Sequence, residues 1–248
     1  MSLGRSALVA VFCLLAGSAA AVESPTPAIG VVFQTEFNGA LGRLNTNERD
    51  LLYTKPVYTN EVVHTGKQSS TALLFLDKTR LQVGANSDVV LDRYVYDPSS
   101  NIGNVAVNFS SGIFRFVTGK MKNKDGYGLK TPSGVMAIRG TKLIIYVDEK
   151  GNTITYVEVG EITAISCGGK KVDVHAGQSV LIPIDCSGVT VVEGNLTPPD
   201  PAVVADLPMP QDLAEALELL DSLEPAAGPD DESPPPAEHD PKSNASQQ

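Results

Sequence analysis

The sequence predicts an all-β fold, a single domain of many short strands that is solenoid-like or sandwich-like, followed by a disordered C-terminal tail. Apolar and β-branched residues recur in short runs, many with the period-two alternation of strands. Gly, Asn, Asp and Pro residues separate these runs, and no helical periodicity occurs before residue 200. The pattern by itself fits a sandwich, a barrel or a solenoid.

Short apolar runs fill the first half of the domain. Residues 29–33 open the pattern, and residues 72–76 are almost continuously apolar, as expected for a strand covered on both faces. Two half-buried strands are then predicted on either side of Gly112 by the alternating residues Val105, Val107, Phe109, Phe114 and Phe116. The polar, Gly-containing residues 121–128 predict a hairpin loop.

Residues 131–147 predict two short apolar strands that meet at a corner, Arg139-Gly140-Thr141. We expect Gly140 to permit this corner, and Pro132 and Gly177 to be structural as well. The alternative, in which Arg139 recognises an anion, is less favoured because the triplet joins two strongly apolar strands. After a turn, further strands are predicted at residues 153–159, 162–166, 172–174, 180–184 and 189–192.

The N-terminus has the pattern of a secretory signal peptide. Arg5 precedes a short apolar run at residues 7–16, and Ala19-Ala20-Ala21 offers a small-residue cleavage site. A membrane anchor is disfavoured because a span needs about 20 apolar residues. We therefore expect cleavage of residues 1–21, a periplasmic or secreted protein, and no transmembrane segment in the mature chain.

Two cysteines remain after the predicted cleavage, Cys167 and Cys186. An exported chain enters an oxidising compartment, so we expect them to form a disulfide rather than two free thiols. Their spacing excludes a Cys-x-x-Cys redox pair.

Charge and proline divide the mature chain into a β-domain at residues 22–196 and a tail at residues 197–248. The tail contains 12 of the 29 acidic residues, 11 of the 17 prolines and no aromatic residue, which predicts disorder. Within it, residues 211–223 have the pattern of a short amphipathic helix, with an apolar stripe of Leu213, Ala216, Leu217 and Leu220. This helix could dock on the β-domain or on a partner, but a segment this short is expected to be only transiently helical. Because the mature chain is acidic, nucleic acid is not expected as a partner.

The segment from residue 115 to residue 142 contains seven basic residues and only one acidic residue, Asp125. Scattered solvated charges are the favoured interpretation. The alternative is a basic ridge that binds an anionic partner, which includes the acidic tail of the same chain. The members of this basic ridge are Arg115, Lys120, Lys122, Lys124, Lys130, Arg139 and Lys142.

Enzyme signatures are mostly missing. The histidines, His64, His175 and His239, have no metal-ligand spacing, and neither a P-loop, a nucleophile elbow nor a dinucleotide fingerprint occurs. Carboxylates that could pair for acid–base chemistry, and so keep an envelope hydrolase as a weak alternative, are Asp77, Asp92 and Glu158. We expect no catalytic site, no metal and no cofactor.

Several segments, in order, resemble the FecR domain over roughly residues 55–182. They include Asn60–Gly66, Leu76-Asp77-Lys78-Thr79, in which Lys78 stands where the family has glycine, and Ser111–Lys120. Thr131-Pro132 followed by Ile138-Arg139-Gly140-Thr141, and then Val174-His175-Ala176-Gly177-Gln178, complete the resemblance.

The resemblance implies an all-β periplasmic module without catalytic residues. The namesake is a regulator of iron-dicitrate transport that relays the occupancy of an outer-membrane receptor to a sigma factor. It also has a cytoplasmic sigma-binding segment and a transmembrane helix, neither of which we expect here. We therefore expect an exported binding module for an envelope protein or glycan, with a role in iron-uptake signalling as the alternative.

Overall fold

The computed structural model describes residues 26–36, 39–123, 126–200 and 203, and its fifteen regular elements are all β-strands. The all-β prediction is therefore confirmed. The predicted signal peptide, the helix at residues 211–223 and most of the predicted tail lie outside the described residues. The described part of the chain contains no helix that is long and apolar enough to cross a membrane.

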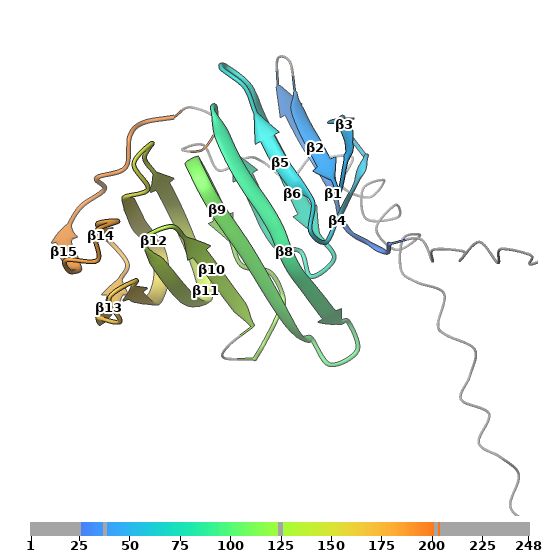
Figure 1. Ribbon diagram of the computed structural model, residues 1–248. Coiled ribbons are helices and arrows are strands. Elements are labelled where there is room, and N and C mark those ends of the chain that lie inside the picture. Colours follow the sequence, from blue (N-terminus) through green and yellow to red (C-terminus); the bar gives the residue numbers. More distant parts are fainter. Residues whose placement is uncertain (1–25, 37–38, 124–125, 201–202, 204–248) are drawn as a thin grey trace, which may run out of the picture.

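The strands form one open sheet that folds over into two facing layers (Figure 1). Layer A runs in the order β3 (Asn47–Leu51), β2 (Ala40–Leu44), β5 (Val62–Thr65), β8 (Ser87–Asp97), the first half of β9 (Ile102–Val117), β10 (Tyr127–Thr131), the first half of β11 (Gly134–Val147), the second half of β12 (Thr153–Ser166) and β13 (Lys171–His175).

The strands of layer B are described from the same end of the sandwich as those of layer A. Its order is β4 (Pro56–Tyr58), β1 (Ala28–Glu36), β6 (Ser70–Phe75), β7 (Arg80–Val83), the second half of β9, the second half of β11, the first half of β12, β14 (Gln178–Ile182) and β15 (Thr190–Glu193). The arrangement is sandwich-like, with three long strands that run through both layers.

Each of these three long strands bends at a glycine with positive φ: Gly112 in β9 (+107°), Gly140 in β11 (+60°) and Gly160 in β12 (+87°). Glycine adopts such dihedrals without the steric penalty of a side chain. The alternation of inward residues changes phase at each bend. In β11, Met136 and Ile138 face the core before the bend, and Leu143, Ile145 and Val147 after it.

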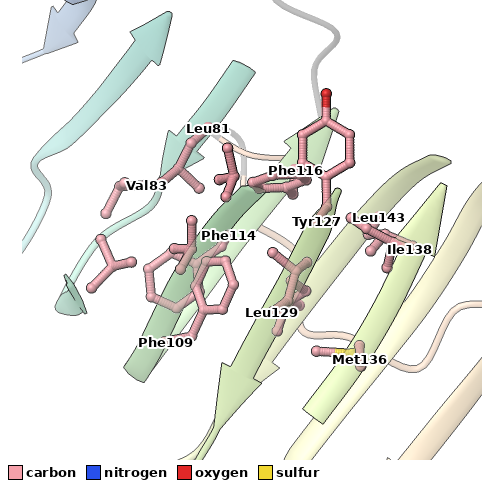
Figure 2. Packing of buried hydrophobic residues seen from close by; sticks show 14 of the residues in the cluster. Leu81, Val83, Phe109, Phe114, Phe116, Tyr127, Leu129, Met136, Ile138 and Leu143 are labelled. Atoms are coloured by element: carbon pink, nitrogen blue, oxygen red, sulfur yellow. The ribbon is translucent and has the colours of Figure 1, made fainter. Parts of the chain in front are cut away.

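The core lies between the two layers (Figure 2). Aromatic rings join the layers directly: Phe109 of layer A and Phe114 of layer B have ring centroids 4.6 Å apart. Tyr94 in β8 stacks on Phe75 in β6 at 5.7 Å. Burial of such rings supplies a large share of the hydrophobic stabilisation.

The prediction of a hairpin loop at residues 121–128 is wrong, because β10 pairs with β9 in parallel, with Tyr127 opposite Val105. The cause is the bend at Gly112. β9 leaves layer A there and ends in layer B at Val117, so the chain crosses back before β10 begins beside the start of β9.

A buried carboxylate fastens the β6–β7 turn to both layers. Asp77 is fully buried and accepts hydrogen bonds from Thr79 Oγ1 (2.6 Å), Tyr127 Oη (2.5 Å) and Tyr94 Oη (3.2 Å). Burial, together with the Asp77 charge, raises the pKa of both tyrosines above the usual range. Lys78, where the FecR pattern has glycine, adopts φ +70°, so this turn keeps a glycine-like backbone.

The expected disulfide between Cys167 and Cys186 is present, with the two Cα atoms 5.3 Å apart. It joins the end of β12 to the segment that follows β14. By loop entropy a bridge of this span stabilises the fold by about 3 kcal/mol.

Candidate binding face

The outer face of layer A is open over β11, β12 and β13, and holds a hollow of about 540 Å³. We call it the sheet hollow and define it by its outward side chains Ala137, Arg139, Glu161, Thr163, Ile165 and Lys171. Strand register brings them together, since Ala137 lies opposite Thr163, Arg139 opposite Glu161, and Ile165 opposite Lys171.

Alternation along the strands explains why these residues point outward. Their neighbours Met136, Ile138, Ile162 and Ala164 are buried in the core, so the intervening side chains must face solvent. The hollow lies at the edge of layer A, because β13 pairs only with β12 among the described strands. Exposed sheet edges and faces are common places for partner proteins to bind.

The charges at the sheet hollow are mixed in sign. Glu161 Oε2 lies 3.3 Å from His175 Nδ1, and Glu161 is opposite Arg139 in the strand register. Thr163 Oγ1 donates to Asp173 Oδ1 at 2.7 Å. An apolar floor with both charge signs around it suits a protein surface better than a uniformly anionic polymer.

A second, smaller hollow of about 230 Å³ lies at the other end of layer A, over β2, β5 and β8. Leu41, Arg43, Glu48 and Val62 line it together with His64, whose Nδ1 lies 2.8 Å from Asp88 Oδ1. Both hollows are thus on the same face of the molecule.

The predicted basic ridge is divided between the two outer faces. Arg139 and Lys130 are exposed on layer A, where Lys130 pairs with Asp92 at 3.2 Å. Arg115 and Lys142 lie on the outer face of layer B, and Arg115 is 4% exposed and ion-paired with Glu158 at 2.8 Å. Lys120 and Lys122 are exposed in the loop after β9, and Lys124 lies outside the described residues.

The three carboxylates considered for acid–base chemistry lie in separate places. Asp77 is in the buried turn, Asp92 on the outer face of layer A and Glu158 on that of layer B. Across the described ranges, no three His, Cys, Asp or Glu side chains gather as a metal site would require.

Arg139 is the one residue of the sheet hollow that the sequence-based site prediction contains. Thr163 and Ile165 come from β12, which pairs with β11, and Lys171 comes from β13, which pairs with β12. These pairings cannot be read from the sequence alone. The available signal was the alternation in residues 162–166, where Thr163 and Ile165 occupy the phase opposite to the core residues.

Comparisons with known proteins find similarity over part of the chain. Residues 61–163 match the family described as "FecR protein". Two crystal structures of a candidate anti-sigma factor from Parabacteroides distasonis ATCC 8503, at 1.65 and 2.50 Å resolution, align with 11% identity and a TM-score of 0.43. These alignments cover 54% of this chain and 60% of that chain. No curated protein sequence matches. The part of the chain that is similar to this family thus runs from the residue before β5 to the second half of β12.

Proposed function

We propose that this chain is an exported, non-enzymatic FecR-type binding module of the cell envelope, and that its sheet hollow binds a partner protein. The observation that carries the proposal is the sheet hollow itself. It combines exposed apolar side chains, Ala137 and Ile165, with Arg139, Glu161 and Lys171 at an open sheet edge. A partner protein with complementary charges could bury these apolar side chains, and the charge pairs would fix its orientation on the sheet.

Two observations support the envelope as the compartment. Arg5 and the apolar residues 7–16 have the pattern of a signal peptide. Cys167 and Cys186 are joined in a disulfide, which is typical of oxidising compartments.

The second candidate function is a component of iron-uptake signalling, together with an outer-membrane receptor and a sigma factor. The match of residues 61–163 to the FecR family favours it, since the namesake of that family is a regulator of this kind. An envelope hydrolase is the weakest alternative, because Asp77, Asp92 and Glu158 do not converge on one site.

Photo-cross-linking tests the proposed face. A photoreactive amino acid replaces Ala137 in the sheet hollow of the full-length protein, expressed in its native cells. Lys150, exposed in the turn between β11 and β12, serves as the matched control position. We expect a discrete protein adduct from position 137 that Arg139→Glu reduces at least fivefold, and no such adduct from position 150.

Equal adducts from both positions, or none from position 137, would contradict the proposed binding face. The two candidate functions then differ in the response to iron. An adduct whose amount follows the iron supply of the cells supports signalling, and an amount independent of iron supports a constitutive envelope interaction.

A further inference from the structure

Part of the outer face of layer B is apolar and buried, although it points away from the core. Val31 and Leu74 are opposite each other in β1 and β6 and are 0% exposed, and Ile144 in β11 is 1% exposed. None of the three belongs to the main core cluster, whose members are their neighbours Val32, Leu73 and Ile145. We call this surface, which also includes Ile113, the covered face.

The described strands all belong to the two layers, so none of them covers this face. The chain beyond β15 does return to it. Val203 is fully buried against Ile113 and Ile144. Arg115 Nη1 donates to the carbonyl oxygen of Val203 at 3.4 Å, and Asp200 Oδ2 accepts from the amide of Ala85 at 3.3 Å.

Close packing at the β7–β8 connection depends on this return. A Cβ atom at Gly84 would lie 2.7 Å from Asp200 Oδ2 and 2.9 Å from Val203 Cγ2. Residues 200 and 203 are therefore seated tightly on the domain, and Val203 lies at the β9–β11 part of the covered face.

The sequence just beyond Val203 has the length and pattern to cover the rest. Residues 211–223 carry the apolar stripe Leu213, Ala216, Leu217 and Leu220. A helix of that length spans about 20 Å at ~1.5 Å per residue. The five strands from β11 through β9, β7 and β6 to β1 span about 19 Å at ~4.8 Å per gap.

Charge is complementary as well. The same segment carries Asp212 and Asp221 on the two sides of the apolar stripe of the predicted helix, and Glu215 and Glu218 on its opposite face near Ser222. The outer rows of layer B contain the basic residues Arg80 and Lys142, besides Arg115, whose charge is already paired with Glu158. Acidic flanks on an apolar stripe would therefore meet basic residues around an apolar face.

We propose that residues 211–223 form an amphipathic helix that docks on the covered face, with Leu213, Leu217 and Leu220 against Val31, Leu74 and Ile144. The tail then provides a third layer of the domain. This layer closes the outer face of layer B to partners and leaves the outer face of layer A as the accessible one. The inference rests on the contacts of Asp200 and Val203 and does not depend on the proposed function.

Disulfide trapping in the full-length protein tests the contact. Leu217→Cys is combined with Leu74→Cys in one variant and with Ile144→Cys in another. Ser222→Cys, on the side of the helix opposite the apolar stripe, replaces Leu217→Cys in the matched controls. After mild oxidation, mass spectrometry of the unreduced protein should find an intramolecular bond from position 217 to at least one of the two partners. The bond from position 222 should be at least fivefold less abundant.

Bonds of equal abundance from both positions, no bond from position 217, or a bond between two chains would overturn the proposal. A dye that binds exposed apolar surface gives a second measurement. Leu217→Asp should raise its fluorescence severalfold, whereas Ser222→Asp should leave it unchanged. Equal fluorescence of the two variants would mean that something else covers the face, such as residues 1–25, a second copy or a partner, and would also overturn it.

Discussion

At the scale of single residues, Asp77 is a buried carboxylate whose loss of hydration is compensated by specific hydrogen bonds. A carboxylate without solvent contact is stable only when hydrogen bonds replace its hydration. Asp77 receives such bonds from Thr79, Tyr94 and Tyr127, which come from three different parts of the chain. The turn between β6 and β7 is thereby bonded to β8 and β10.

Tyr127→Phe removes one donor to this buried charge and keeps the ring. We expect a loss of about 2 kcal/mol in the free energy of unfolding, measured by chemical denaturation, because bonds to charged groups contribute about 1.5–3 kcal/mol. Tyr96→Phe is the matched control, since its hydroxyl donates to the neutral Asn101 at 2.8 Å. An equal loss in both variants would argue against a special role of the Asp77 charge.

Asp97, the last residue of β8, gives a pH-dependent prediction. Hydrogen bonds from the hydroxyls of Ser100 and Ser99 lower the pKa of its carboxyl to about 2 from 3.8. A depressed folded-state pKa stabilises the fold above the unfolded-state pKa, and this stabilisation is lost as pH falls through the folded-state value. Asp97→Asn should therefore lower the melting temperature at pH 6 and have progressively less effect between pH 4 and pH 2. A pH-independent difference in thermal melts would contradict this.

At the scale of elements, the bends at Gly140 and Gly160 differ in what they would tolerate. A Cβ at Gly160 would lie 2.7 Å from the carbonyl oxygen of Gly140 and 2.8 Å from Thr141 Cγ2, whereas one at Gly140 would meet nothing within 4 Å. Gly140→Ala should cost about 1 kcal/mol of unfolding free energy from the left-handed backbone alone. Gly160→Ala should cost about 3 kcal/mol, because overpacking adds to the strain.

Chemical denaturation of both variants measures the difference. Gly177→Ala is a useful reference, since Gly177 has φ +90° and a Cβ atom added there would meet nothing within 4 Å. If Gly160→Ala is no more costly than Gly177→Ala, close approach of β11 and β12 at the bend is not what requires glycine there.

Most strand positions could be predicted from the sequence, but it did not show which neighbouring strands are parts of one bent strand. Val105, Val107 and Phe109 alternate in one phase, and Phe114 and Phe116 in the other, which looks like two strands. The structure has one strand with a bend, and the change of phase at Gly112 is the trace that the bend leaves in the sequence. The parallel pairing of β10 with β9 could not be predicted, because it depends on where β9 ends in the other layer.

The candidate site was predictable only in part, for a related reason. Neighbours in sequence such as Arg139 and Lys142 lie on either side of a bend and so face opposite sides of the molecule. Arg139 instead lies beside Glu161, some twenty positions later. A cluster of like charges in the sequence therefore does not form one surface when the strands between them change layer.

At the scale of the whole molecule, the two layers cannot unfold separately, because β9, β11 and β12 belong to both. We expect one cooperative transition in denaturant, with coincident midpoints for far-UV circular dichroism and tyrosine fluorescence. Midpoints that differ beyond experimental error would indicate that one layer is lost first.

The two layers end in four edge strands, β3 and β13 in layer A and β4 and β15 in layer B. The sequences of these strands affect whether the protein aggregates at high concentration. Open sheet ends can template the addition of further strands and so the growth of fibrils. Here β4 begins with Pro56, which has no amide hydrogen to donate, and β3 carries Glu48, Arg49 and Asp50 in succession. At the other end, β13 carries Lys171 and Asp173, and β15 is only four residues long. Proline, charge and brevity at these positions oppose end-to-end polymerisation, so an open sandwich of this kind can remain in solution as separate molecules.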